Sequence, residues 1–302
     1  MKKRELNLDI AGGISEVERL MGQFLLKKIL YRTIFRGKGL EFDGYRDFNP
    51  DDDAGNIDWK ASYRANELLV KQYIEERDLK ILFIVDVGEN MLSGSQEKLK
   101  CEYAAELAAA LSHLIINEGD NIGFVFFNDK IIQYVPPKKG IKQFNLFVGE
   151  LSDPLLYGGA EDSTKVLGEL SETADSSLNA IIIISDFIRI KKGFSEALKS
   201  FSQRFEVMAI MVKDPLDKTL PKIKGELIIE DPVTKEQMLI DPSVAGKKYE
   251  KIALEQENMV KQIFIDTNVD FLSLTTDKPF PFYLAEFLRE RVRKGKHLTP
   301  TR

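Results

Sequence analysis

From residue 79 onward, short apolar runs alternate with longer segments in which apolar residues recur at helical spacing. The short runs are apolar throughout, which is typical of strands that helices cover on both faces of a parallel sheet. The pattern predicts strands at 80–87, 121–128, 179–187, 205–212 and 269–276. Helices are predicted around them at 95–117, 141–152, 163–173, 193–203 and 243–265, with a final helix near the C-terminus. This alternation predicts an α/β fold with a doubly wound, mostly parallel sheet.

Two parts of the chain depart from this rhythm. Residues 225–241, "GELIIEDPVTKEQMLID", predict an inserted β-hairpin that turns at the Asp-Pro pair. Near the N-terminus, residues 14–35 predict one or two amphipathic helices. The stretch 36–76 is rich in Gly, Asp and aromatic residues, and only its end, "ELLVKQYIE", alternates like a strand. We therefore expect an N-terminal block at 1–76 and a sheet domain at 77–302, which includes the hairpin and the last helix.

The composition narrows the class of protein. A formal net charge of −5 argues against a dedicated nucleic-acid binder, which would carry a broad basic excess. Cys101 is the single cysteine, so the chain has neither an intrachain disulfide nor a multi-cysteine metal site. The N-terminal sequence lacks a signal-peptide core, and no run approaches the ~18 apolar residues of a membrane-spanning helix. We expect a cytoplasmic protein with no membrane-spanning segment and no nucleic-acid partner.

Two aspartates follow buried strands: Asp86 after "ILFIV" and Asp186 after "AIIIIS". In open α/β sheets, ligands bind outside the carboxyl ends of the strands, where both residues fall. A buried ionised carboxylate must be paired, hydrogen-bonded or metal-bound. Each aspartate could simply cap the next turn or helix. Together they could also form a shared metal site, which would suit either an ion-dependent binding surface or a metal-dependent hydrolase that uses Asp86 and Asp186.

The two aspartates and the strand order resemble the von Willebrand factor type A fold, a Rossmann-like fold. In that fold an Asp-x-Ser-x-Ser turn, a later Thr and a later Asp hold one Mg²⁺ at a metal-ion-dependent adhesion site. Here Asp86 and Asp186 match, Asn90 offers an amide oxygen, and Gly88 and Ala160 stand where hydroxyls are expected. Residues near the threonine position are Asp162, Ser163 and Thr164. The resemblance implies a degenerate ion site with Asp86, Asn90 and Asp186 as its ligands.

The N-terminal block carries a second resemblance. The run "GLEFDGYRDFNPDDDAGNIDWKASYR", followed by "LLVKQYIEE", resembles the signature of domain-of-unknown-function family 58. The positions that carry the match include Arg46, Asp52, Asp53, Asp58, Trp59 and Arg64. The arginines suit bidentate ion pairs with the aspartates, and Trp59 suits an anchor on the sheet domain. The same residues would also suit a surface that contacts a partner.

This resemblance implies a function. Members of the family look like von Willebrand factor type A-type interaction proteins that work with MoxR-type AAA+ ATPases in assembly or maturation of a partner. Neither a phosphate-binding glycine loop nor a nucleophile beside either of the two histidines is found in the sequence. The sequence therefore predicts a non-enzymatic interaction module with a MoxR-type partner and Mg²⁺ as the candidate ion. The hydrolase that uses Asp86 and Asp186 is the alternative.

Overall fold

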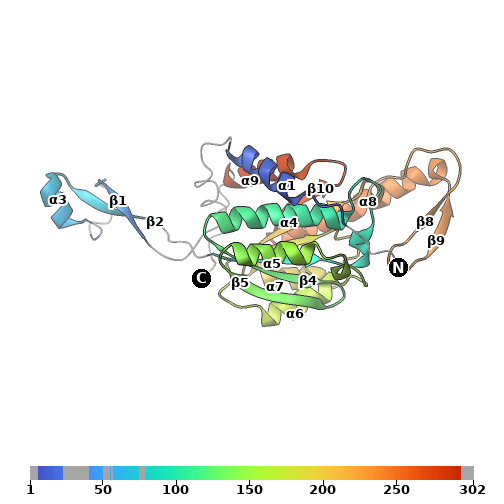
Figure 1. Ribbon diagram of the computed structural model, residues 1–302, viewed down its shortest axis with the longest axis horizontal. Helices are drawn as coiled ribbons and strands as arrows, with labels where there is room; N and C mark the ends of the chain where they lie inside the picture. Colours follow the sequence, from blue (N-terminus) through green and yellow to red (C-terminus); the bar gives the residue numbers. More distant parts are fainter. Residues whose placement is uncertain (1–5, 23–40, 50–54, 56, 75–78, 294–302) are drawn as a thin grey trace.

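The computed structural model of the 302-residue chain describes all residues except 1–5, 23–40, 50–54, 56, 75–78 and 294–302 (Figure 1). Its centre is a six-stranded sheet in the order β10-β7-β6-β3-β4-β5. The strands are β3 Lys80–Asp86, β4 Asn121–Phe127, β5 Ile131–Lys138, β6 Ala180–Ser185, β7 Glu206–Lys213 and β10 Asp270–Thr275. All neighbouring pairs are parallel except β4 and β5. The predicted α/β fold with a mostly parallel sheet is confirmed.

Helices cover both faces of this sheet, as a doubly wound fold requires. One face packs against α1 Ile10–Gly22, α4 Lys100–Asn117, α5 Ile141–Leu151 and α9 Phe280–Arg293. The other face packs against α6 Ser163–Thr173, α7 Phe194–Ser202 and α8 Pro242–Asp266. Figure 1 shows α4 and α5 side by side over the sheet, with α1 and α9 beyond α4. Helix α4 is buried along most of its length because α1 also packs on it.

Strand β3 shows why the apolar runs were continuous. Phe83 and Val85 belong to the core on one face of the sheet, whereas Leu82 and Ile84 belong to the core on the other. Successive side chains of a strand point to opposite faces, so only an uninterrupted apolar run fills both cores. Each such side chain contributes roughly 1.5–3 kcal/mol through burial. This burial holds the end of β3, and with it Asp86, in a fixed position.

The edge strand β5 was not predicted. Its side chains alternate between half-buried and exposed along "IIQYVPPK", and Pro136 and Pro137 stand just before its last residue. Proline has no N–H for the ladder, so it is tolerated on an edge strand and disfavoured in a central one. Gly123 of the neighbouring strand β4 accommodates the second proline, because a Cβ there would lie 2.7 Å from the Pro137 nitrogen.

Elements β1 Glu41–Asp47, α3 Trp59–Ala65 and β2 Leu69–Ile74 form a small unit with an antiparallel strand pair. This unit projects away from the layers of the large sheet (Figure 1). Helix α1 also belongs to the predicted N-terminal block, but it packs on the large sheet's core, where its Val17 and Met21 lie beside α4. The expectation that Trp59 anchors on the sheet domain is wrong, since 67% of its surface is exposed. The predicted boundary between 1–76 and 77–302 stays a prediction.

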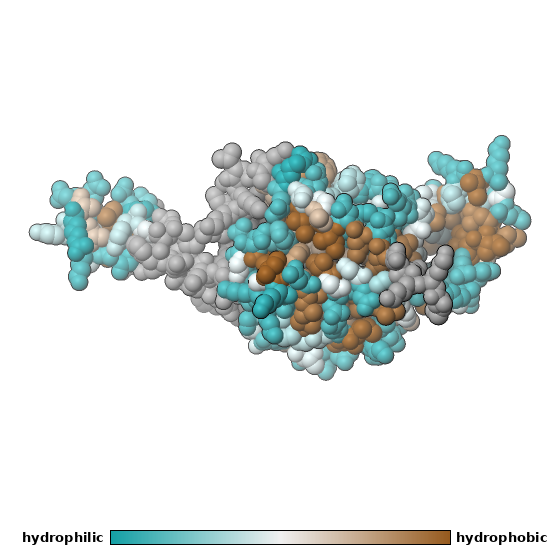
Figure 2. All heavy atoms as spheres, in the orientation of Figure 1, coloured by the Kyte–Doolittle hydropathy of each residue, from teal (hydrophilic) through white to brown (hydrophobic). Residues whose placement is uncertain are grey.

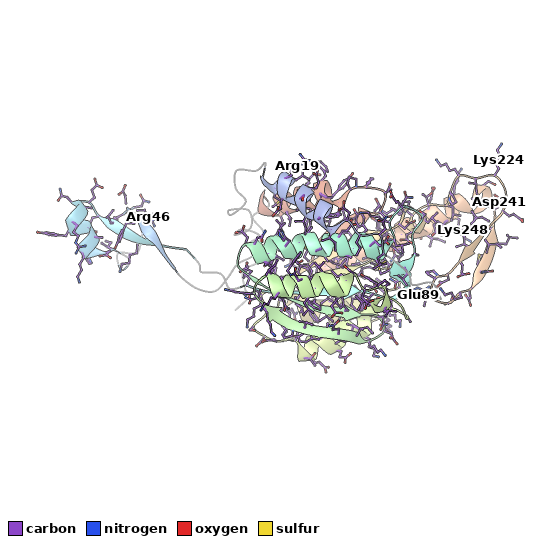
Figure 3. The ribbon with its side chains drawn as sticks, viewed as in Figure 1. Arg19, Arg46, Glu89, Lys224, Asp241 and Lys248 are labelled. Carbon is purple, nitrogen blue, oxygen red and sulfur yellow. The ribbon has the colours of Figure 1, made fainter. Side chains whose placement is uncertain are left out.

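The predicted hairpin is present as β8 Leu227–Glu230 and β9 Gln237–Ile240. Its turn closes with the Asp231 N–H donating to the Glu236 carbonyl at 2.9 Å. The hairpin lies beside the N-terminal half of α8, and from its base near Lys224 and Asp241 it returns toward Glu89 (Figure 3). Two ion pairs fix the turn at the carboxyl ends of the strands. Lys235 pairs with Glu89, and Arg189 pairs with Asp231.

Candidate functional site

Asp86 and Asp186 lie next to each other at the carboxyl edge of the sheet, because Asp86 ends β3 and Asp186 follows the neighbouring strand β6. Their exposed fractions are 0% and 1%. Burial, reinforced by the negative charge of Asp186, raises the pKa of Asp86 to about 6. The sequence therefore placed both carboxylates correctly at one edge.

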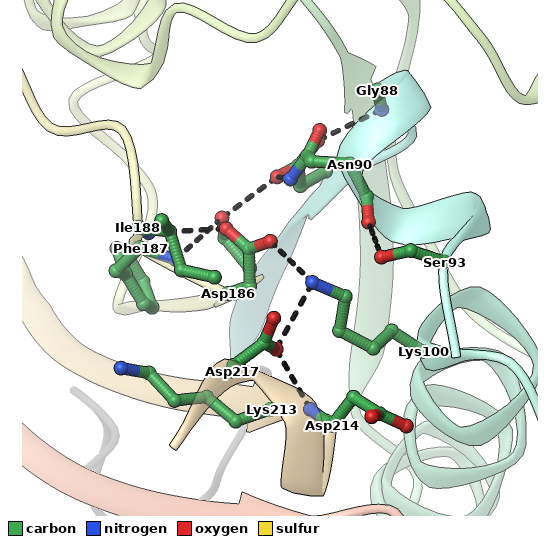
Figure 4. A network of polar contacts seen from close by, with 12 residues as sticks. Gly88, Asn90, Ser93, Lys100, Asp186, Phe187, Ile188, Lys213, Asp214 and Asp217 are labelled. Carbon is green, nitrogen blue, oxygen red and sulfur yellow. Dashed lines mark hydrogen bonds and ion pairs between the residues drawn. The ribbon is translucent and has the colours of Figure 1, made fainter. Parts of the chain in front are cut away.

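Asp86 is held by neutral donors. Its Oδ1 accepts the Gly88 N–H at 2.8 Å, and its Oδ2 accepts Asn90 Nδ2 at 2.9 Å and Ser185 Oγ at 2.7 Å. Asn90 belongs to the short 3₁₀ helix η2 Glu89–Leu92, which begins directly after Gly88. Figure 4 shows Gly88 and Asn90 at the top of this contact network. These contacts agree with the alternative that Asp86 caps the turn after its strand, and they lower the free-energy cost of burying its carboxylate.

Asp186 is held by a cation of the chain itself. Lys100 Nζ lies 2.8 Å from Asp186 Oδ2 and 3.1 Å from Asp217 Oδ2, and the Ile188 N–H donates to Asp186 Oδ1 at 3.1 Å. Burial opposes ionisation of Asp186, but the Lys100 ammonium outweighs it and lowers the pKa of Asp186. Figure 4 shows Lys100 between the two carboxylates. The residue after Asp186, Phe187, has φ 48°, a strained value for a bulky side chain.

A third carboxyl, Glu161, joins Asp86 from the loop before α6. Burial, reinforced by the charge of Asp86, raises the pKa of Glu161 to about 8. Its Oε1 accepts the Ser163 N–H at 2.7 Å, and the Ser163 hydroxyl beside the carboxylate also opposes this rise in pKa. The sequence did not single out Glu161. The only available signal was a carboxylate next to Ala160, in a loop that the fold brings to the strand ends.

The Mg²⁺ ligand arrangement of the von Willebrand factor type A fold is not reproduced at these positions. A Cβ on Gly88 would lie 2.4 Å from Asn90 Oδ1, so the present Asn90 position excludes a serine there. Of the residues considered for the threonine, Asp162 caps α6 and pairs with Lys191, and Thr164 accepts the Lys191 N–H. Only Ser163 is buried beside Glu161. The ligand roles predicted for Asp86, Asn90 and Asp186 stay predictions.

Among the described residues, no three His, Cys, Asp or Glu side chains form a metal centre by themselves. Any ion at the strand ends would therefore need amide or hydroxyl oxygens as well. Oxygen donors at this edge include the carboxylates of Asp86, Asp186 and Glu161, the amide of Asn90 and the hydroxyls of Ser163 and Ser185. Oxygen donors of this kind suit hard divalent cations.

The signature residues of the N-terminal block lie in the small unit rather than at this edge. Asp58 is the N-cap of α3, where it accepts the Lys60 and Ala61 N–H groups, and Lys71 lies 3.5 Å from its carboxylate. The predicted pairing of Arg46 and Arg64 with Asp52, Asp53 or Asp58 stays a prediction, and the cation that contacts Asp58 is Lys71. Arg46 donates to the Asp47 carbonyl at 3.1 Å. Asp52 and Asp53 lie outside the described residues.

The six-stranded sheet and the residues at its carboxyl edge define a doubly wound α/β protein with a buried acidic cluster at the carboxyl ends of its strands. Sequence comparison names the family. The chain belongs to the family of proteins of unknown function DUF58, whose profile matches residues 44–259. This confirms the family predicted from the Arg, Asp and Trp signature. The chain is also 25% identical to the uncharacterized proteins Rv1480 of Mycobacterium tuberculosis and Mb1516 of Mycobacterium bovis, over 85% of this chain and 81% of each relative.

Solved structures with a similar arrangement include the conserved hypothetical protein BatB from Bacteroides thetaiotaomicron. It has 15% sequence identity and a TM-score of 0.49, over 71% of this chain and 99% of that one. A von Willebrand factor type A protein from Catenulispora acidiphila has 13% identity and a TM-score of 0.34, over 62% and 44%. The fold class rests on the strand order and helix layers of this chain. None of its described helices is long and apolar enough to cross a membrane.

Proposed function

We propose that this chain is a non-enzymatic interaction module whose strand-end surface docks a protein partner. The proposal rests on one observation, which is that hydrogen-bond donors of the chain itself already engage both strand-end aspartates. Asp86 accepts three neutral hydrogen bonds, and Asp186 pairs with Lys100. A hydrolase that used these carboxylates would need them to reach a substrate, and both are buried. Their arrangement favours a rigid turn that supports a surface.

The surface consists of the η2 turn together with the hairpin that returns to it. Ile228 and Leu239 are cross-strand partners on one face of the hairpin, and Met238 lies on the other; all three are largely exposed. Figure 2 shows apolar atoms gathered on this end of the molecule. The ion pair between Lys235 and Glu89 lies beside them. An apolar centre with a charged rim is the usual anatomy of a protein interface.

The family resemblance implies a MoxR-type AAA+ ATPase as the partner. The proposed task of the pair is the assembly or maturation of another protein. A location in the cytoplasm is part of the same proposal. The von Willebrand factor type A-like character of the fold agrees with this role, because function in such folds resides in the surface at the strand ends.

The test is binding of the purified chain to a MoxR-type ATPase from the same genome, measured by biolayer interferometry. Replacing Ile228 and Leu239 together by Asp is expected to weaken binding ~10-fold or more, because apolar anchors dominate interface energy. The matched control is Ile265→Asp, which alters an equally exposed apolar residue at the far end of α8 and leaves binding unchanged. Equal loss in both variants contradicts the proposed surface. Turnover of p-nitrophenyl phosphate that disappears in Asp86→Asn would support the hydrolase instead.

A further inference from the structure

The small unit formed by β1, α3 and β2 exposes two aromatic rings on one face of α3. Trp59 and Tyr63 are 67% and 90% exposed. They stand four residues apart in the helix, so their side chains are neighbours on its surface. Tryptophan is highly buried on average in folded proteins, because its ring carries a large apolar area. Two exposed rings beside each other therefore indicate a surface that a binding partner covers.

The residues after α3 complete a pocket around these rings. Asn66 has φ 57° and ψ 29°, the left-handed conformation that ends a helix, and its N–H donates to the Ser62 carbonyl. The chain then reverses and brings Glu67 and Leu68 beside the helix. The result is a pocket of about 320 Å³ that is lined by Trp59, Ser62, Tyr63, Asn66, Glu67 and Leu68. Ligand pockets span roughly 300–1,000 Å³, so this one suits a single side chain better than a large cofactor.

Ser62 fixes α3 on β2 and so preserves the shape of the pocket. Its hydroxyl is buried, accepts the Leu69 N–H at 2.9 Å and donates to the Asp58 carbonyl at 2.8 Å. Asp58 in turn caps α3, and Lys71 of β2 lies 3.5 Å from its carboxylate. A partner therefore meets a preformed site, and its binding requires little ordering of the backbone.

The charge around the pocket is negative. Among the described residues that line it, Glu67 is the charged one, and within the described part of the chain its carboxylate has no ion pair. Lys60 and Arg64 of α3 do not belong to the lining, and Lys71 is engaged by Asp58. Over the whole stretch 41–74, the sequence holds eight Asp or Glu residues and four Lys or Arg residues. This charge is complementary to a cationic partner.

We propose that this pocket binds an arginine or lysine side chain presented by a basic segment of a protein partner. The cation lies against the faces of Trp59 and Tyr63, which attract it through their ring quadrupoles, and Glu67 is its counter-ion. A purely apolar occupant would leave the Glu67 carboxylate desolvated without a partner. The same carboxylate repels the phosphates of a nucleic acid. The inference goes beyond the proposed docking function and does not depend on it, because the described lining includes no residue of the hairpin.

The experiment uses the fluorescence of Trp59, which is the single tryptophan of the chain and therefore reports directly on this pocket. The full chain is titrated with the peptide acetyl-Gly-Arg-Gly-Arg-Gly-amide. We expect a saturable change in emission with half-saturation at roughly millimolar concentration, and weaker binding when NaCl is added. The corresponding peptide with Glu in place of Arg is the probe control, and it is expected to give no saturable change.

Two pairs of variants separate the contributions of charge and ring. Glu67→Gln is expected to weaken binding of the arginine peptide about threefold or more, because it removes the counter-ion. Its matched control is Glu172→Gln, which changes the net charge equally at an exposed position of α6 and leaves affinity unchanged. Tyr63→Phe keeps the ring and the affinity, whereas Tyr63→Leu keeps an apolar side chain without a π face and weakens binding about threefold. Circular dichroism verifies that each variant is folded.

Several results would overturn the cation pocket. They are the absence of a saturable response in the unaltered chain, equal effects of Glu67→Gln and Glu172→Gln, and unchanged affinity in Tyr63→Leu. A saturable response to octathymidylate instead of the arginine peptide would assign a single-stranded nucleic acid, contrary to the proposal. The Ile228→Asp/Leu239→Asp double variant is expected to keep the response to the arginine peptide. Its failure to bind the ATPase while it keeps this response would show that the two surfaces act separately.

Discussion

Lys100 offers the sharpest test of how the strand ends are stabilised. It stands at the start of α4 and is 1% exposed, and its Nζ contacts both Asp186 and Asp217. Lys100→Met keeps the length and the apolar stem of the side chain but removes the ammonium. Among the described residues, the Ile188 N–H and the Asn90 amide then remain to stabilise the charge of the buried Asp186.

Breaking a buried ion pair on one side commonly costs about 3–5 kcal/mol, because the remaining charge is left without compensation. We expect a loss of this size in the free energy of unfolding of Lys100→Met. At roughly 2–4 °C per kcal/mol for a domain of this size, the melting temperature falls by on the order of 10 °C. The same change raises the pKa of Asp186, since the Lys100 ammonium is what lowers it.

Guanidinium unfolding at pH 7, followed by circular dichroism, measures this loss in a double-mutant cycle with Asp186→Asn. The double variant is expected to recover part of the stability, because Asp186 no longer carries a charge, whereas Asp217 still loses its contact with the Lys100 ammonium. Lys251→Met serves as the control. It breaks an exposed pair with Glu255 on α8 and is expected to change stability by under about 0.5 kcal/mol. A loss of less than about 1 kcal/mol in Lys100→Met would refute the reasoning.

Three further predictions concern other parts of the chain. Burial raises the folded-state pKa of Glu161 to about 8 and that of Asp86 to about 6. Their protonated forms therefore stabilise the metal-free folded state fully below pH ~4, and this contribution to the free energy of unfolding is lost as pH rises toward 8. Urea unfolding between pH 5 and 8.5 should show this decline, and Glu161→Gln should flatten it. Lys235→Ala breaks a partly exposed pair with Glu89, so it should cost under about 1 kcal/mol yet increase amide hydrogen exchange in the hairpin. Phe147→Ala removes a fully buried ring that stacks on the sheet, and calorimetry should show a loss of about 3–5 kcal/mol.

The large sheet was predictable because burial on both faces leaves a local signal. Each parallel strand except β10 is apolar almost without interruption, and the flanking helices repeat at 3.6 residues. Strand β5 was not predicted because its sequence lacks this continuous apolar signal. As an edge strand it is covered less completely, so its pattern alternates and tolerates Pro136 and Pro137. Local sequence thus reports how fully a strand is covered rather than how long it is.

The candidate site was predictable only where the topology alone decides the position. Asp86 and Asp186 were found because each follows an apolar strand, and parallel neighbours end at the same edge. Lys100 was missed because its partner Asp186 is 86 residues away and no local pattern links them. Glu161 was missed because its role depends on a loop that folds back onto Asp86.

The carboxyl groups at the strand ends fall into two halves with different charge compensation. Asp186 and Asp217 share Lys100, whereas the donors to Asp86 and Glu161 among the described residues are neutral. Neutral donors do not cancel two negative charges in a buried site, so the second half is complete only with a proton or a bound cation. The two halves therefore respond to different variants. Removing Lys100 together with Asp186 changes stability without altering the half that contains Asp86 and Glu161, whereas Glu161→Gln raises stability at pH 8.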